Sequence, residues 1–147
     1  GEHKSVVGVV SKTDLLDAID LRMLNILAIA LGGAAGSVSR HLVGATALRL
    51  FGSGFPVGTM TVNIVGSFVM GVLASLFALR WSASETARFL LTTGFLGGFT
   101  TFSAFSLDFA TLTGRGELAS AAFYAIASVV FSILALFAGL WLGKGLG

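Results

Sequence analysis

Two apolar stretches of this 147-residue chain carry hydrogen-bonding side chains at four-residue intervals. The first series is Thr59, Asn63 and Ser67, and the second is Tyr124, Ser128 and Ser132. Residues four apart share one face of an α-helix, so each series predicts a polar stripe along an otherwise apolar helix. Such stripes serve either as hydrogen-bonded contacts between membrane helices or as the lining of a polar pathway. The spacing alone leaves both interpretations open.

The segment GFLGGFTTFSAFS, residues 94–106, has the composition of an interrupted helix. The pair Gly97-Gly98 costs a helix about 2 kcal/mol relative to alanines, and Thr100-Thr101 can bond back to the backbone. A break in mid-membrane must be buried in protein or line a cavity, and the carbonyl end of its first half-helix suits a cation. Alternatively, the glycines only permit close packing, as we expect for Gly32-xxx-Gly36.

Phe102 and Phe105 follow this predicted break at a spacing of three residues. A phenylalanine ring is negative on its faces and positive at its edge. Two ring edges can therefore line the path of an anion without holding it as tightly as an arginine would. The alternative is that these rings face lipid or the protein core, as most of the 13 phenylalanines must.

The sequence lacks the residues that several kinds of catalytic and binding site require. Without cysteine there is no disulfide, thiolate metal site or cysteine nucleophile. His3 and His41 are too few and too far apart to suggest a metal site, and neither forms part of a visible nucleophile–base pair, so we expect no enzyme. A net charge of +2 without a basic run gives no support for a nucleic-acid partner.

The composition places the body of the chain in lipid. Hydrophobic residues make up 55% and charged residues 11%, against about 25% charged in soluble proteins. Uncharged stretches cover residues 23–39, 50–79, 89–107 and 118–143, and a membrane helix needs about 20 apolar residues. We therefore predict an all-α membrane protein with four spans and a third helix broken in mid-membrane. The first span extends to about residue 47, and the second begins near Pro56.

Lysine and arginine positions barely select an orientation for the four spans. In the membrane body, one side carries Arg22, Arg80, Arg88 and Lys144, and the other carries Arg40, Arg49 and Arg115. So small a difference allows insertion in either direction, and hence an antiparallel dimer. Lys4 and Lys12 strengthen the bias and favour one orientation for this chain.

Residues 1–21 form a short polar extension that precedes the four-span domain, residues 22–147. The run Ser5–Val10 predicts a short strand, and Asp14–Ile19 predicts one or two helical turns. The stretch from Gly8 to Leu15 resembles the last strand-to-helix turn of a CBS motif, in which Ser11 and Asp14 would contact a nucleotide. The alternative is an ordinary capped amphipathic segment, because the rest of such a module is missing.

Three segments together resemble one known family, the Fluc (CrcB-type) fluoride channels. They are GGAAGSVSR at residues 32–40, GTMTVNIVGSF at 58–68, and GFLGGFTTFSAFS at 94–106. The resemblance spans about residues 23–143. It implies an antiparallel, dual-topology homodimer with two fluoride pores and a structural sodium ion, lying in lipid as a multi-pass protein of the inner (plasma) membrane.

The resemblance also implies roles for individual residues. Asn63 would donate its amide to fluoride, and Phe102 and Phe105 would present ring edges along the pore. The remaining pore residues would be Thr59, Tyr124, Ser128 and Ser132. Arg40 would lie at an aqueous vestibule, and the backbone carbonyls of Gly97 and Thr100 would bind the sodium ion. Ala104 departs from the family pattern, in which a hydroxyl residue often stands at this position.

Two other functions compete with a passive fluoride channel. The first is a small proton-coupled secondary transporter, which generally needs a carboxylate inside the membrane. Asp108 is expected only at the end of the third span, and this favours the channel. The second is a non-transporting membrane anchor, which would leave two polar stripes and a broken helix without a purpose.

Overall fold

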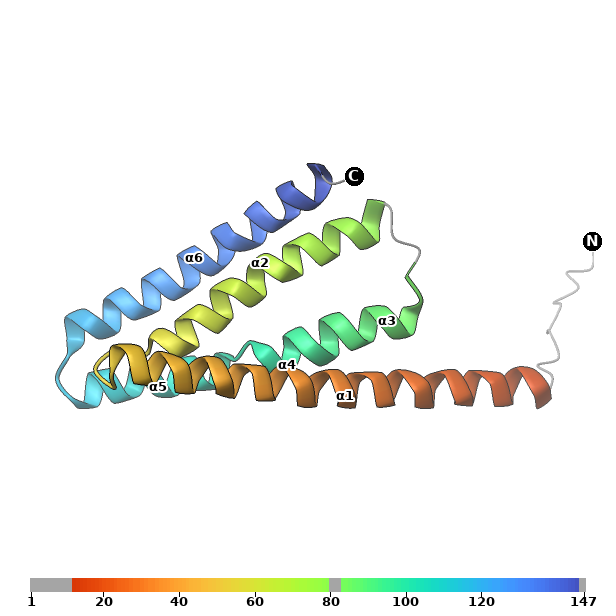
Figure 1. The fold of residues 1–147 in the computed structure, drawn as a ribbon, viewed down its shortest axis with the longest axis horizontal. Coiled ribbons are helices and arrows are strands. Elements are labelled where there is room, and N and C mark those ends of the chain that lie inside the picture. The colour runs from red at the N-terminus through yellow and green to blue at the C-terminus, as the bar shows by residue number, and fades with distance from the viewer. Residues whose placement is uncertain (1–11, 80–82, 146–147) are drawn as a thin grey trace, which may run out of the picture.

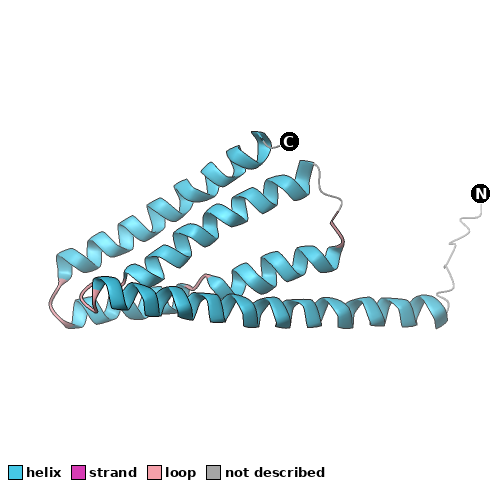
Figure 2. Cartoon of the chain, in the orientation of Figure 1, coloured by secondary structure: helices cyan, strands magenta, loops and turns pink. Residues whose placement is uncertain are grey.

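The computed structural model describes residues 12–79 and 83–145 of the chain, and these residues form helices joined by short loops (Figures 1 and 2). The segments in chain order are α1 (Lys12–Phe51), α2 (Val57–Leu79), α3 (Glu85–Phe89), the π-helix η1 (Leu90–Leu96), α4 (Gly97–Phe99), α5 (Phe102–Gly114) and α6 (Leu118–Gly145). Within these ranges there is no strand. The all-α prediction is confirmed.

Four helical spans are long and apolar enough to cross a membrane. They are Leu16–Phe51, Val57–Leu79, Glu85–Gly114 and Leu118–Gly145, so the predicted number of spans is confirmed. The third span combines α3, η1, α4 and α5. It continues past Asp108 to Gly114, which corrects the expectation that this residue marks its end.

The first helix is much longer than its predicted membrane segment. α1 has 40 residues, or about 60 Å, whereas the hydrocarbon core is about 30 Å thick. It runs without interruption from Lys12 and extends beyond the rest of the bundle at its N-terminal end (Figure 1). The predicted turns at residues 14–19 are thus the start of the first span's helix. The predicted strand at residues 5–10 and Ser11 lie outside the described residues.

The third span is interrupted one residue after the glycine pair. Gly97 and Gly98 are still helical, whereas Thr100 (φ −85°, ψ 159°) and Thr101 (φ −156°, ψ 125°) are extended. The hydroxyl of Thr101 then accepts a hydrogen bond from the Ala104 amide and caps α5. The predicted broken helix is therefore confirmed, with two extended residues between its halves.

Glycines set how closely the helices pack. α2 and α6 lie side by side (Figure 1), and a Cβ on Gly71 or Gly139 would collide with backbone of the opposite helix. On the other side of the fold, Gly32 and Gly36 of α1 pack in the same way on η1, and Gly98 packs on Gly33. The interpretation that glycines permit close helix packing is thus correct for Gly32, Gly36 and Gly98. It does not exclude the broken helix, which the third span also has.

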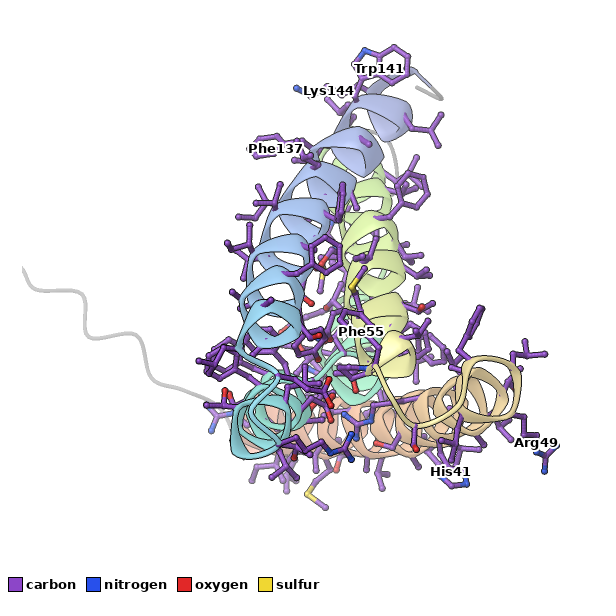
Figure 3. The ribbon with its side chains drawn as sticks, turned by 90° about the vertical axis from the view of Figure 1, so that its left-hand side faces the viewer. His41, Arg49, Phe55, Phe137, Trp141 and Lys144 are labelled. Carbon is purple, nitrogen blue, oxygen red and sulfur yellow. The ribbon has the colours of Figure 1, made fainter. Side chains whose placement is uncertain are left out.

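The apolar surface is distributed as expected for a protein in lipid. A small buried cluster of Leu112, Ala121 and Tyr124 joins α5 to α6. By contrast, large apolar side chains point away from the bundle, among them Phe137 and Trp141 on α6 (Figure 3). In water this arrangement would be unfavourable, so it supports a multi-pass membrane protein.

Candidate functional site

A groove of about 740 Å³ runs along α2, the broken third span and α6. Most of the predicted site residues line it, and so does Ser67 of the first polar stripe. These site residues are Asn63, Gly97, Thr100, Phe102, Phe105, Ser128 and Ser132. The other lining residues include Thr92, Thr93 and Thr101, which the sequence analysis did not assign to the site. The two polar stripes therefore meet on one surface, together with both phenylalanines. Thr59, Tyr124 and Arg40 lie outside this groove.

Asn63 joins the second span to the break in the third. Its Nδ2 donates to the Thr101 carbonyl oxygen at 3.0 Å, and its Oδ1 accepts from the Thr101 amide nitrogen at 2.8 Å. One side chain thereby satisfies both backbone groups of an extended residue that no helix can satisfy. An amide nitrogen has two N–H groups, so one donor of Asn63 is left for a ligand in the groove.

Arg40 reaches the same break from the first span. Its Nη1 donates to the Thr100 carbonyl oxygen at 3.1 Å, and the side chain is half-buried. The Thr100 carbonyl lies at the negative end of the half-helix that precedes the break, where a positive charge is stabilising. The structure thus places the guanidinium against the interrupted backbone, which the sequence analysis did not anticipate.

Phe102 and Phe105 differ in their surroundings although both line the groove. Their ring centroids are 5.3 Å apart. Phe105 also packs on Tyr124, with 5.2 Å between centroids, and belongs to the border of the buried cluster. Phe102 is 76% exposed within the subunit. Its ring is therefore free to contact a ligand or another subunit.

Ser128 carries a buried hydroxyl with no hydrogen-bond partner. The residue is 4% exposed, and it lines the groove. A buried hydroxyl without a partner costs free energy, so its presence needs a reason. Ser75 has the same property at 3% exposure but lies against Gly143, away from the groove. Ser128 thus differs from Ser75 in being one of the residues that line the groove.

A second cavity, of about 300 Å³, lies at the end of the first polar stripe. Thr59 lines it, together with Asp108 and Thr111. Tyr124 is fully buried, and its hydroxyl donates to Asp108 Oδ2 at 3.1 Å. Sequence reasoning missed Asp108 because it took the charge as the end of a span. Its position three residues after Phe105 was the available signal, since that spacing places both residues on one helix face.

The backbone at the break has the chemistry of a site for a hard cation. Gly97 and Thr100 both line the groove, and Gly97 is exposed within the subunit. Carbonyl oxygens at the C-terminal end of a half-helix are typical sodium ligands. The Thr100 carbonyl oxygen keeps one lone pair beside its bond from Arg40. Among residues 12–79 and 83–145, no cluster of three or more His, Cys, Asp and Glu side chains offers a metal site.

The fold and the groove together define a class of protein: a four-span membrane protein with a broken third helix and neutral hydrogen-bond donors along an intramembrane groove. Residues 27–140 match the family described as CrcB-like protein, Camphor Resistance (CrcB). This match covers most of the chain, and the chain belongs to the CrcB-like family.

This chain aligns with similar proteins over nearly the full length of those proteins. The chain is 57% identical over 124 residues to a fluoride-specific ion channel FluC of Agrobacterium fabrum, which covers 84% of this chain and 99% of the relative. It is 52% identical to a protein of the same name from Mesorhizobium japonicum and 54% identical to one from Rhizobium etli, each over 84% of this chain and 99% of the relative.

Proposed function

We propose that this protein is a fluoride channel, which exports fluoride passively across the cytoplasmic membrane. The observation that carries this proposal is the groove, which is lined by neutral donors from two helices and by Phe102 and Phe105. Fluoride is small and strongly hydrated, so a pore must replace its water shell with several donors that each bind weakly. Relatives named as fluoride-specific channels, at 52–57% identity, support this choice of ion.

The proposal assigns donors along the path. Asn63 has one N–H free, Ser128 has an unpartnered hydroxyl, and Ser132 continues the same helix face. Phe102 and Phe105 would present ring edges to the ion. Thr59 and Tyr124 would extend the path toward the second cavity.

The functional unit of the proposal is an antiparallel homodimer with two pores. The groove is open along one side of the subunit, and Phe102 beside it is 76% exposed, so a second copy would close it. The nearly balanced charges of the body fit insertion in both directions. A sodium ion held by carbonyls of Gly97 and Thr100 would supply a fixed positive charge near the dimer axis.

One observation favours a second candidate, a proton-coupled exporter. Asp108 lies within the third span, six residues before its last residue Gly114, so this span carries a carboxylate. However, Asp108 lines the smaller cavity rather than the groove, and its Oδ2 accepts a hydrogen bond from Tyr124.

Fluoride efflux from liposomes with clamped gradients separates the two candidates. With valinomycin and a potassium gradient to set the membrane potential, a channel releases fluoride when proton and sodium gradients are both zero. The Asp108→Asn variant should keep passive efflux. If efflux needs a proton or sodium gradient and disappears in Asp108→Asn, the protein is a coupled transporter and the channel proposal is wrong.

A further inference from the structure

The guanidinium of Arg40 and the proposed cation ligands meet at one atom, the carbonyl oxygen of Thr100. Arg40 Nη1 donates to this oxygen at 3.1 Å, and Thr100 lines the groove beside Gly97. A carbonyl oxygen has two lone pairs, so one can accept from the guanidinium while the other faces a bound ion. Two positive charges would then share one neutral ligand.

We propose that Arg40 sets the affinity of the broken helix for a monovalent cation by repelling that cation across the shared Thr100 carbonyl; this inference rests on the sodium site of the proposed function. Arg40 is then a positioning and affinity-setting residue at the break. It weakens cation binding and at the same time places a positive charge of its own at the break.

The repulsion is large enough to measure. The Arg40 guanidinium donates to a neutral carbonyl oxygen, and this hydrogen bond does not neutralise the positive charge of the arginine. An ion on the second lone pair would lie about 5 Å from the guanidinium. At the effective dielectric of a half-buried site, a unit charge at that distance changes the affinity by about tenfold or more.

The carbonyl keeps its place when Arg40 is removed, because other bonds hold the break. Both the backbone nitrogen and the hydroxyl of Thr100 donate to the Leu96 carbonyl oxygen at 2.9 Å. On the other side, Asn63 holds both backbone groups of Thr101. Loss of the arginine therefore removes a charge from the site while its cation ligands stay in position.

Sodium affinity of purified full-length protein tests the inference. Sodium is titrated against N-methylglucamine at constant ionic strength, with binding measured by calorimetry and by the rise of Tm. We expect Arg40→Gln to bind sodium about tenfold more tightly than the wild type, and Arg40→Lys, which keeps the charge, to remain close to it. The control is Arg49→Gln, which removes an exposed charge that points away from the bundle (Figure 3) and should bind sodium as the wild type does.

A second measurement needs no charge-removing variant. In the wild type, sodium should shift the side-chain Nε–H resonance of Arg40 and leave that of Arg49 unchanged.

Damage to the fold weakens ligand binding, so tighter sodium binding by Arg40→Gln identifies a charge effect. The inference is wrong if Arg40→Gln binds sodium equally or more weakly, if the Arg40 resonance is insensitive to sodium, or if no variant binds sodium.

These outcomes are distinguishable from failure of the channel itself. Passive fluoride efflux by the same wild-type preparation tests the proposed function. Efflux that persists while Arg40→Gln shows no gain in sodium affinity overturns the inference and leaves the channel intact. A gain in sodium affinity without any fluoride efflux supports the inference and overturns the channel.

Discussion

The side-chain amide of Asn63 is bonded to both backbone groups of Thr101, as donor at 3.0 Å and as acceptor at 2.8 Å. This pair ties the second span to the extended residues of the third. In lipid no water can satisfy such a backbone, so the amide substitutes for the missing helix partners. The residue that the family resemblance implies as a fluoride donor is therefore also a structural part of the break.

Replacing Asn63 with leucine tests this double role. Asn63→Leu has a similar volume but leaves the amide and the carbonyl of Thr101 without partners, at about 1–3 kcal/mol for each group. We expect a clearly lower Tm in detergent and loss of fluoride efflux. Thr86→Val is the control, because it removes a hydrogen bond of 2.6 Å to Asn25 away from the groove. It should keep full efflux, and normal efflux in Asn63→Leu would contradict the assignment.

The two buried serines without partners form a matched pair. Ser128→Ala removes the hydroxyl that lines the groove, whereas Ser75→Ala removes one at the contact of α2 with Gly143. Each substitution removes an unsatisfied buried group, so neither should lower Tm. We expect reduced fluoride efflux in Ser128→Ala alone. Equal efflux in both variants would remove Ser128 from the pore.

The close contact between α2 and α6 gives a prediction on stability. A methyl group in Gly139→Ala would collide with the Phe68 carbonyl oxygen, so the helices must move apart. We expect a loss of about 1–3 kcal/mol, visible as a lower Tm. Gly44→Ala places its methyl group in open space on α1 and should be neutral or stabilising. If both variants have wild-type Tm, the helices do not pack this closely.

The hydrogen bond between Tyr124 and Asp108 predicts that two conservative variants lose different amounts of stability. Tyr124→Phe removes the donor and leaves a carboxylate oxygen in the membrane without it, at about 1.5–3 kcal/mol. Asp108→Asn keeps an oxygen that can accept the same bond, so it should cost less. Thermal unfolding of both variants tests this order. A greater loss in Asp108→Asn would show that the charge, rather than the hydrogen bond, stabilises the pair.

The number of spans and the polar stripes could be predicted because apolar length and helical spacing are local properties of the chain. Asn63, Ser67, Ser128 and Ser132 do lie on one groove, as four-residue spacing suggested. The broken helix was also predictable, since two glycines and two threonines weaken any helix. However, its position depends on packing, because Gly98 lies against Gly33 and stays helical.

Other features depend on contacts between distant residues and could not be found by local reasoning. Arg40 and Thr100 are 60 residues apart, and only the folded chain shows their hydrogen bond. Asp108 follows an uncharged run, so local patterning places it at a span boundary. Its bond from Tyr124 explains why a carboxylate is tolerated within a span.

Fluoride efflux from liposomes, compared between wild type and Phe102→Ile, tests whether the groove is the path of fluoride. Phe102 packs on Phe105 and is 76% exposed within the subunit, so Phe102→Ile should lower Tm less than Phe105→Ile, because the Phe105 ring also packs on Tyr124. If fluoride passes through the groove, we expect rapid efflux by the wild type and at least about tenfold slower efflux by Phe102→Ile, because an aliphatic side chain has no positive ring edge. Equal efflux by the two folded proteins would show that fluoride does not pass along this groove.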